Sequence, residues 1–422
     1  MKKCDFETSK IIFLFGKEQE TDTNMNTVGL ITEYNPFHKG HAYHIEKSKE
    51  MTRADFAIAV MSGDFVQRGT PALLPKHIRA EMALQNGADL VLELPVQYAT
   101  GSAELFAHGA VSILNSLGVV THLCFGSECG DHTRLMEIAR ILSDEPVWYR
   151  DTLQENLKKG LSYPAARAEA LPQYRELLES PNNILGIEYC KAILRLKSDI
   201  KPLTLKREGN DYHETTLGTS FASASALREQ LLAGAEPCTL ADYIPEQSLE
   251  ILSNGMAKYG YMSENDLSGL LVYRLMMLSS PAELYPYADM SEELAARIYK
   301  NRNEFHSFSQ FADLLKTREV TRTRINRALL HLILNIKKGT DTVPYARVLG
   351  FRKNAAPMLN EIKQKAAFPL LTKTADYQKI LTPEQQKSFL ESTNASMLFE
   401  AVNAQKTGCS IKSEFTKQLV II

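Results

Sequence analysis

Short apolar runs alternate with helical patterns through the first half of this chain, and that alternation limits the fold more than any other feature. The runs contain many β-branched residues and do not alternate apolar with polar, which is typical of parallel strands buried on both faces. Strands separated by helices form right-handed crossovers, so we expect an α/β fold with a doubly wound parallel sheet. The predicted strands are residues 27–32, 56–61, 90–94, 119–125 and 202–205.

The second half of the chain has a different pattern. Beyond residue 240 the strand signals stop and amphipathic helical patterns take over. We therefore expect an α/β domain at 25–240, followed by an all-helical domain at 241–422. Met25 lies directly before the first strand, and the apolar stretch ahead of it is too short for a signal peptide or a membrane span. We interpret residues 1–24 as an extension or a disordered tail.

The composition is that of an ordinary globular chain, with 422 residues, 44% hydrophobic, 23% charged and a formal net charge of -2. That balance gives no overall basic field for nucleic acid, although a local basic face could still bind a phosphate backbone. The six cysteines are scattered without a CxxC pair, which favours free thiols in a reducing, cytoplasmic protein. No segment reaches 18 apolar residues, so we expect no membrane span.

The first predicted strand ends in the turn EYNPFHKGH, residues 33–41. Pro36 fixes its own φ angle and keeps the preceding residue extended, so the chain breaks cleanly out of the strand. Gly40 has no side chain, which leaves room for a ligand against the start of the helix predicted at 40–52. Free N–H groups and a partial positive charge make such a helix start a natural anion site.

Three histidines surround this helix start. His38 and His41 lie three residues apart, so both can donate hydrogen bonds to one phosphate, and His44 lies one turn further on the same face. A tight turn with surface histidines is one alternative. A metal site is another, although the HExxH spacing of zinc helices is absent. The position after the first strand favours phosphate binding.

A second polar turn, SFASASALR at 220–228, opens a helix after the fifth predicted strand. Serine hydroxyls and helix N–H groups there would meet further phosphate oxygens, and Arg228 would add charge; a routine N-cap is the alternative. Asp64 and Arg68 follow the second strand. Asp64 could hold a magnesium-bound water, orient a histidine or cap a turn, and Arg68 could neutralise phosphate or contact RNA. For His77 we expect packing or capping.

His38-Lys39-Gly40-His41 resembles the HIGH motif of the nucleotidylyltransferase superfamily, and the turn at 220–228 resembles its serine-rich second signature. Longer segments resemble one narrower family, the bacterial tRNA(Met) cytidine acetate ligases. The resemblance spans nearly all of residues 25–380. The segments that carry it are GLITEYNPFHKGH, MSGDFVQRGTPALLPKHIRAEMALQNGADLVLELP, FGSE, PNNILGIEY, SFASASALR, TRTRINRALLHLIL and YARVLGF.

The resemblance implies an enzyme that joins acetate to the α-phosphate of ATP, releases pyrophosphate and acetylates N4 of the wobble cytidine (C34) of elongator tRNA(Met). It implies Mg²⁺ bound with ATP, no dedicated protein metal site, and His38 and His41 as the catalytic pair. Asn182 and Lys206 are alternates to Asn183 and Arg207 among the nucleotide contacts. The full implied set of nucleotide contacts is Ile31, Thr32, Glu33, Tyr34, Asn35, Pro36, Phe37, His38, Lys39, Gly40, His41, Ala42, Tyr43, His44, Gly126, Asn182, Asn183, Lys206, Arg207, Ser223 and Ser225.

A tRNA substrate needs a basic surface and a place for the unstacked base. In the helical half, Arg322, Arg324 and Arg327 are the predicted RNA contacts, with a solvated helix face as the alternative. Tyr34 and Phe65 are aromatic candidates for holding the base.

Two rival functions are open from the residues alone. One is an adenylyltransferase that moves AMP onto a phosphorylated coenzyme precursor, although such enzymes are usually one small domain. The other is a nucleotide-binding, RNA-associated protein without turnover, which would keep the ATP turn and the basic helices.

Overall fold

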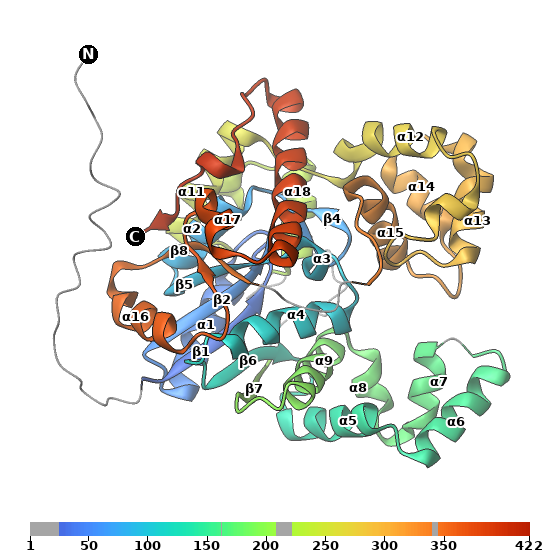
Figure 1. Ribbon diagram of the computed structural model, residues 1–422, viewed down its shortest axis with the longest axis horizontal. Coiled ribbons are helices and arrows are strands. Elements are labelled where there is room, and N and C mark those ends of the chain that lie inside the picture. Colours follow the sequence, from blue (N-terminus) through green and yellow to red (C-terminus); the bar gives the residue numbers. More distant parts are fainter. Residues whose placement is uncertain (1–24, 162, 208–221, 340–344) are drawn as a thin grey trace.

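The computed structural model describes residues 25–161, 163–207, 222–339 and 345–422 of the chain. The extension predicted at 1–24 and the first two residues of the serine-rich turn lie outside these ranges. Within them the chain forms a central sheet flanked by helices, with two helical lobes beside it (Figure 1).

The sheet confirms the predicted doubly wound fold. Its strands lie in the order β10-β8-β5-β2-β1-β6-β7, and the five predicted strands are parallel to one another. From β1 the chain builds one side of the sheet and then returns to build the other, so the strand order reverses between β1 and β6. Ligands bind at such a reversal, outside the carboxyl ends of the strands. The five strands are β1 (Thr27–Thr32), β2 (Phe56–Ser62), β5 (Leu90–Leu94), β6 (His122–Ser127) and β7 (Lys201–Lys206).

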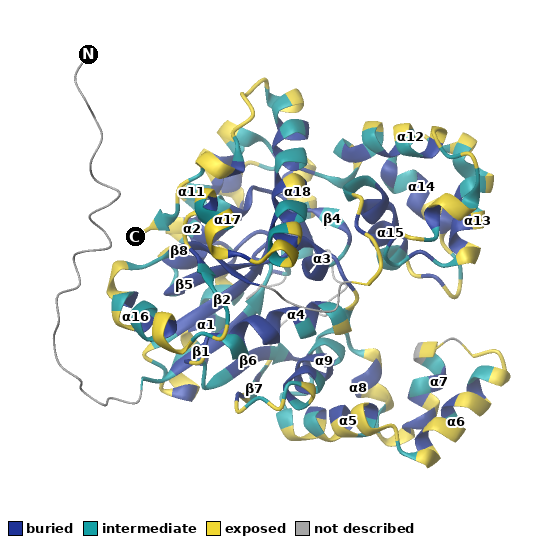
Figure 2. Ribbon diagram, in the orientation of Figure 1, coloured by how far each residue is buried: buried dark blue, intermediate teal, exposed yellow. Residues whose placement is uncertain are grey.

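Both faces of this sheet are covered, as Figure 2 shows. In β2, Ala57 and Ala59 belong to one hydrophobic core and Ile58 and Val60 to another, because successive side chains point to opposite faces. The helices that form these two layers include α1 (Lys39–Thr52), α2 (Lys76–Gln85), α10 (Ala224–Leu232) and α11 (Glu246–Tyr259) on one face, and α4 (Ala103–Ser116), α5 (His132–Asp144) and α9 (Pro181–Arg195) on the other.

Two helical lobes lie beside the sheet at the right of Figure 1. The lower lobe contains α6 (Val147–Lys158), α7 (Tyr163–Ala170) and α8 (Arg175–Glu179), and α8 packs against α9. The upper lobe has its own core, to which Leu271, Phe311 and Leu329 contribute. Its helices are α12 (Ser268–Met276), α13 (Glu292–Asn301), α14 (Phe308–Leu315) and α15 (Arg322–Leu334). The prediction of a helical region in the second half is confirmed by these helices and by α16 (Ala356–Lys365), α17 (Tyr377–Ile380) and α18 (Pro383–Thr407).

The expectation that strands end before residue 241 differs from the structure. β8 (Ala346–Phe351) pairs antiparallel with β5, and β9 (Leu370–Leu371) and β10 (Val420–Ile421) pair with β8. A single short apolar run is not distinctive in a helical stretch, and only its pairing with β5 makes it a strand. A division of the chain at residue 240 remains a prediction, and these strands argue against a clean one.

A cluster of buried charges joins the C-terminal segment to the catalytic sheet. The Lys76 Nζ lies 2.7 Å from a Glu93 oxygen, 2.8 Å from a Glu414 oxygen and 3.7 Å from an Asp64 oxygen. Arg347, from β8, pairs with Glu93 at 2.8 Å and with Glu414 at 2.6 Å. All five side chains are buried. We define these five residues as the buried ion cluster.

This cluster accounts for Asp64, whose role was open from the sequence, and for His77, for which packing or capping was expected. Asp64 also accepts a hydrogen bond from the Lys76 backbone N–H at 2.7 Å, so it caps the start of α2. His77 lies with its Nε2 3.4 Å from Glu414. Both residues hold the fold together, and neither lines the cavity described next.

Candidate active site

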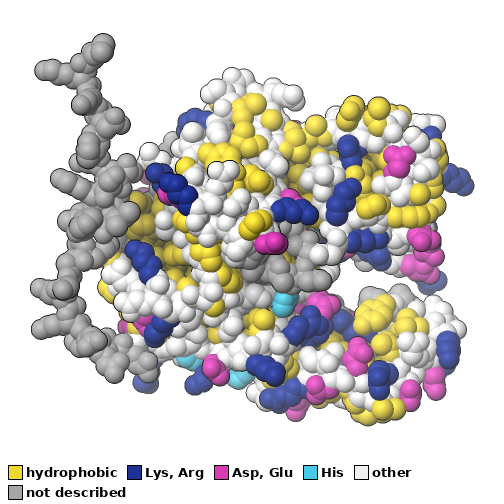
Figure 3. Space-filling view, in the orientation of Figure 1, with side chains coloured by type: hydrophobic (Ala, Val, Ile, Leu, Met, Phe, Trp, Pro, Cys, Tyr) yellow, Lys and Arg dark blue, Asp and Glu magenta, His cyan; other side chains and the backbone are white. Residues whose placement is uncertain are grey.

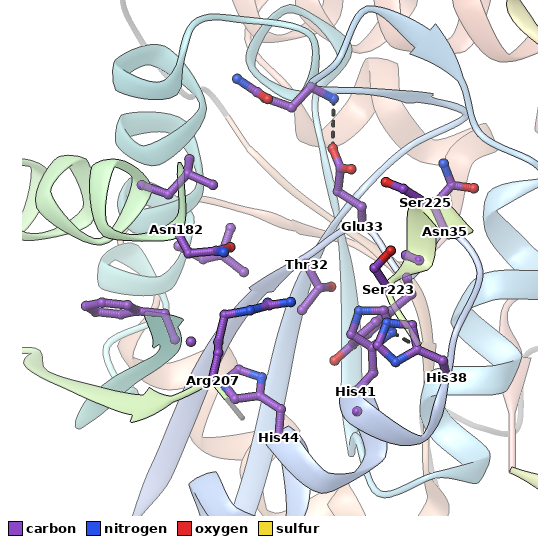
Figure 4. Close-up of a pocket in the computed structure, with 18 of the residues that line it drawn as sticks. Thr32, Glu33, Asn35, His38, His41, His44, Asn182, Arg207, Ser223 and Ser225 are labelled. Carbon is purple, nitrogen blue, oxygen red and sulfur yellow. Dashed lines mark hydrogen bonds between the residues drawn. The ribbon is translucent and has the colours of Figure 1, made fainter. Parts of the chain in front are cut away.

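A cavity of about 300 Å³ lies at the carboxyl ends of β1, β6 and β7, next to the reversal in strand order. The first turns of α1 and α10, the loop after β2 and parts of α4 and α9 surround it. Figure 4 shows His38 and His41 across the cavity from Asn182. The predicted residues that line it are Ile31, Thr32, Glu33, Tyr34, Asn35, His38, Gly40, His41, Tyr43, His44, Gly126, Asn182, Lys206, Arg207, Ser223 and Ser225.

His38 and His41 form a stacked pair at the start of α1. Their ring centroids are 3.7 Å apart and their planes 23° apart. The His38 backbone N–H donates to the His41 Nδ1 at 3.3 Å. A neutral imidazole that accepts at Nδ1 carries its proton on Nε2. This hydrogen bond therefore assigns the Nε2–H tautomer to His41 and leaves that N–H as a donor.

All three histidines of the turn are neutral at pH 7. Burial lowers the pKa of His38 to about 3, with Arg207 and Arg228 adding to the shift. Burial and Arg207 lower the pKa of His44 to about 4, and burial with the neighbouring histidines holds the pKa of His41 well below its usual value. Nearby cations penalise imidazolium, so these rings act on an anion as uncharged donors, and the positive charge comes from the arginines.

The second wall of the anion site is the start of α10. The Ser223 Oγ accepts from the Ala226 N–H at 3.1 Å, which is the N-cap considered from the sequence. Arg228 donates to the Asn35 carbonyl at 2.6 Å and to the Ser225 Oγ at 3.1 Å. Arg228 therefore fastens the first turn of α10 to the β1 turn, and the N-termini of α1 and α10 lie at the same cavity.

Two buried polar atoms in this region test whether a nucleotide fits. The His38 Nδ1 and the His44 Nε2 have no hydrogen-bond partner among the described residues. Buried polar groups without partners are costly, so such atoms in a cavity indicate that a ligand supplies the partners. The donor set of imidazoles, helix N–H groups and arginines suits the oxygens of a triphosphate.

The structure separates Asn182 from Asn183. Asn182 lines the cavity, and its Nδ2 donates to a Glu128 oxygen at 2.7 Å. Asn183 is buried and does not line the cavity; its Oδ1 accepts from the backbone N–H groups of Glu128 and Cys129 at 3.0 and 3.1 Å. Asn183 thus braces the loop after β6. Both members of the other pair, Lys206 and Arg207, line the cavity.

Four more residues of the predicted turn do not line the cavity, namely Pro36, Phe37, Lys39 and Ala42. Arg68, whose role was open, does line it. Sequence reasoning missed most of the apolar wall, because such residues cannot be told from ordinary core residues by their pattern. The missed lining residues are Gln67, Phe106, Phe125, Leu185, Tyr189, Leu205, Ala222 and Ala224.

The predicted RNA contacts on α15 differ in their surroundings. Arg327 is buried and forms two hydrogen bonds to the Asp289 carboxylate, at 2.9 and 3.0 Å, so the structure does not support it as an RNA contact. Arg322 pairs with Asp313 and lies 3.7 Å from Glu264. Arg324 forms no ion pair within the described part of the chain.

The two aromatic candidates for holding the base are both buried. Phe65 belongs to the core of the upper lobe, edge-on to Phe399, and is closed to a ligand. Tyr34 lines the cavity but packs edge-on against Phe37 and His41.

The ranges described hold no second site of the metal, disulfide or membrane-spanning kind. Those residues contain no group of three or more His, Cys, Asp or Glu side chains that could hold a metal ion. The five cysteines among them are free thiols. No helix of this part of the structure is long and apolar enough to cross a membrane.

Comparison with known proteins agrees with this geometry. A sequence profile of the family described as HIGH Nucleotidyl Transferase matches residues 25–413. A protein of Thermoanaerobacter sp. (strain X514) named tRNA(Met) cytidine acetate ligase is 43% identical over 370 residues, which are 85% of this chain and 91% of that protein. The like-named protein of Acetivibrio thermocellus is 39% identical over 416 residues, covering 94% of this chain and 100% of that protein.

Two solved structures are similar to this chain over almost its whole length. The apo crystal structure of Thermotoga maritima TmcAL superimposes with a TM-score of 0.89 at 32% identity, over 94% of this chain and 100% of that one. A second crystal form, bound with alpha-thio ATP, gives a TM-score of 0.86 at 32% identity, over 94% and 99% of the two chains.

Proposed function

This chain belongs to the tRNA(Met) cytidine acetate ligase family of HIGH nucleotidyl transferases, and from that premise we propose that it acetylates tRNA(Met). In the proposed reaction ATP and acetate form acetyl-adenylate and pyrophosphate, and the acetyl group then passes to N4 of the wobble cytidine (C34), giving N4-acetylcytidine. The observation that carries the proposal is the cavity at the strand reversal, where two helix starts and neutral, donor-ready histidines meet.

In the first step an acetate oxygen attacks the α-phosphorus of ATP and pyrophosphate leaves. Such a reaction needs positioning and charge stabilisation more than covalent help from the protein. We assign His41, through its Nε2–H, and His38 to the oxygens that gain charge on the α-phosphate. Arg228 and the start of α10 then face the departing phosphates, and Arg207 supplies the remaining positive charge.

The nucleoside would lie on the opposite side of the cavity, over β6 and β7. Gly126 has no side chain and leaves room for the nucleoside at the end of β6, and Phe125 and Tyr189 form an apolar wall. Asn182 adds a polar edge next to them. We propose Mg²⁺ as the partner of the ATP phosphates, held by the nucleotide itself.

The RNA would approach from the side of the helical lobes. Figure 3 shows Lys and Arg side chains on both sides of the recess between the upper and lower lobes. We propose that α15, with Arg324, takes part in this contact, and that the protein works in the cytoplasm, where its tRNA is found. A helical lobe of this size also argues against an adenylyltransferase that serves only a small phosphorylated substrate.

ATP–pyrophosphate exchange with purified protein tests the proposal. We expect exchange that depends on acetate among a panel of small carboxylic acids and that His41→Ala lowers at least about 100-fold, the usual cost of one lost transition-state donor. Nucleoside mass analysis should then show acetylated cytidine in tRNA(Met). Transfer of AMP to a phosphorylated metabolite, or binding without turnover, would contradict the proposed function.

A further inference from the structure

One residue of the cavity has the wrong charge for a phosphate site. Among the described residues that line it, Glu33 is the only carboxylate, whereas Arg68, Lys206, Arg207 and Arg228 are all basic. A carboxylate repels phosphate oxygens, so a role for Glu33 as a direct phosphate contact is physically unfavourable. The residue therefore calls for a different partner, one that offers a hydrogen-bond donor.

The Glu33 carboxylate is held in place by the backbone. Its Oε1 accepts from the Gln67 N–H at 2.7 Å. Its own carbonyl accepts from the Arg79 Nη1 at 2.6 Å, which fixes the end of β1. Within the described part of the chain, Oε2 has no hydrogen-bond or ion-pair partner. One oxygen is thus anchored and the other remains available as an acceptor.

The carboxylate also points to a particular side of the site. In Figure 4 it extends away from His38 and His41, toward the loop after β2 that supplies Gln67. In the same view the groups that we assign to the nucleotide, among them His41, Arg207 and Ser223, lie together below the Glu33 carboxylate. Glu33 therefore stands where a second substrate would meet the adenylate.

The loop after β2 connects this side of the cavity to the helical lobe. The turn between β3 (Phe65–Val66) and β4 (Thr70–Pro71) contains Gly69, and a Cβ added there would overlap the backbone of Asn326 and Arg327 in α15. The loop that touches Glu33 is thus seated directly on the helix with the predicted RNA contacts. An RNA bound along α15 would reach the cavity from the Glu33 side.

We propose that Glu33 receives the cytosine: its free oxygen accepts a hydrogen bond from the N4 amine and takes one of the amine protons as that nitrogen attacks. Acidic side chains accept from cytosine N4 in nucleic-acid recognition, and a positioned carboxylate is a common general base. The inference rests on the proposed function, because it assigns a role in the second half-reaction only.

The step balances without any further reactant. The N4 nitrogen forms a bond to the acetyl carbonyl carbon, and the bond from that carbon to the AMP phosphate oxygen breaks. AMP leaves as its phosphate anion, and one N4 proton passes to the Glu33 carboxylate. The assignment also favours cytosine over uracil, since uracil carries a carbonyl oxygen at that position and would face the carboxylate with no donor.

Glu33→Gln, which keeps the shape and removes the base, separates the two half-reactions. We expect acetate-dependent ATP–pyrophosphate exchange within about twofold of the parent, and single-turnover acetyl transfer to tRNA reduced about 100-fold or more. Hydroxylamine, a strong nucleophile that needs no base, should be acetylated by the variant at the parental rate. The matched control is Glu46→Gln, an exposed residue of α1 that does not line the cavity and should change neither activity.

Each contrary outcome has a distinct meaning. If exchange in Glu33→Gln falls as far as acetyl transfer does, the carboxylate serves ATP binding or the fold, and the inference is wrong. If transfer is unchanged, Glu33 does not take the proton. Absence of acetate-dependent exchange in the parent protein would instead overturn the proposed function itself.

Discussion

Replacing Lys76 by methionine tests what the buried ion cluster contributes. The lysine side chain is 0% exposed, and its Nζ lies within 3 Å of both Glu93 and Glu414. Methionine is similar in length and apolar, so the change removes the charge with little change in volume. The carboxylates would then lose one of their two closest cations, leaving Arg347.

Removing one partner of a buried ion pair costs about 3–5 kcal/mol, because a charge is left without compensation. A domain is stable by about 5–15 kcal/mol, so Lys76→Met should remove a third or more of that margin. Denaturant unfolding followed by circular dichroism should show a lower midpoint at an unchanged m-value. The control is Lys47→Met, which breaks the exposed pair with Glu50 and should lower the unfolding midpoint much less, because solvent screens that pair. A loss for Lys76→Met no larger than that of the control would refute this reasoning.

The pH dependence of stability in the same variant tests whether Glu414 is the partner of Lys76. Burial raises the pKa of Glu414, but Lys76, His77, Arg347 and Lys417 outweigh it and hold that pKa well below the usual range. A depressed carboxyl pKa contributes stability that is complete above the unfolded value of about 4.3 and is lost as the pH falls. The difference in free energy of unfolding between the parent protein and Lys76→Met should therefore become smaller below about pH 4. A constant difference would contradict the assigned partner.

Three further predictions concern the site and its neighbours. Gly69→Ala should destabilise the protein by clearly more than Gly160→Ala, because both glycines have positive φ (75° and 83°) but only the first would overlap another backbone; denaturant midpoints compare the two, and equal losses would contradict the close packing on α15. His44→Gln should make the free energy of unfolding less sensitive to pH. In the parent protein the pKa of His44 is lowered to about 4, so between about pH 6.5 and 4 the unfolded chain binds this proton and the folded chain does not, and stability falls as the pH falls. An unchanged pH profile would contradict this. Arg324→Glu should weaken tRNA binding and lower the salt slope by about 1 while exchange persists, unlike Lys379→Glu on α17; equal loss of exchange would mark Arg324 as structural.

The parts of the fold that the sequence predicts are those with a local cause. Five strands follow from short β-branched runs, and the ends of β1, β6 and β7 line the cavity because parallel strands end at one edge of the sheet. Pro36 and Gly40 also indicate the turn through a local cause, because proline restricts the backbone at its own position and glycine leaves it free. The sequence does not predict β8, because its strand character depends on pairing with β5, more than 250 residues earlier in the chain, and not on its own residues.

The predicted site residues that lie away from the cavity or the surface are placed there by partners distant in sequence. Arg324 and Arg327 are three residues apart on one helix, yet Arg327 is buried against Asp289 whereas Arg324 is partly exposed. Asn183 faces the loop after β6 and Asn182 faces the cavity, a choice set by Glu128. Such one-residue differences follow from packing, which the identity of the residue alone does not specify.

Helix α2 shows that a usable signal was present even for buried charges. Lys76, Arg79, Ala80 and Ala83 recur at the spacing of one helix face, and all four are buried. Two long cations on an otherwise small, apolar stripe must find partners inside the protein.

Lys76 meets the carboxylates of the buried ion cluster, whereas Arg79 donates to backbone oxygens alone. Its four acceptors are the carbonyls of Glu33, Ser62, Gly63 and Leu74. Burial lowers the pKa of Arg79 to about 10, which leaves the guanidinium charged at pH 7. Carbonyls at the ends of parallel strands have no further ladder to join, and a five-donor cation can satisfy several of them at once. The buried face of α2 therefore predicts that a cation is buried there. Which groups accept its hydrogen bonds depends on strand ends that only the folded sheet brings together.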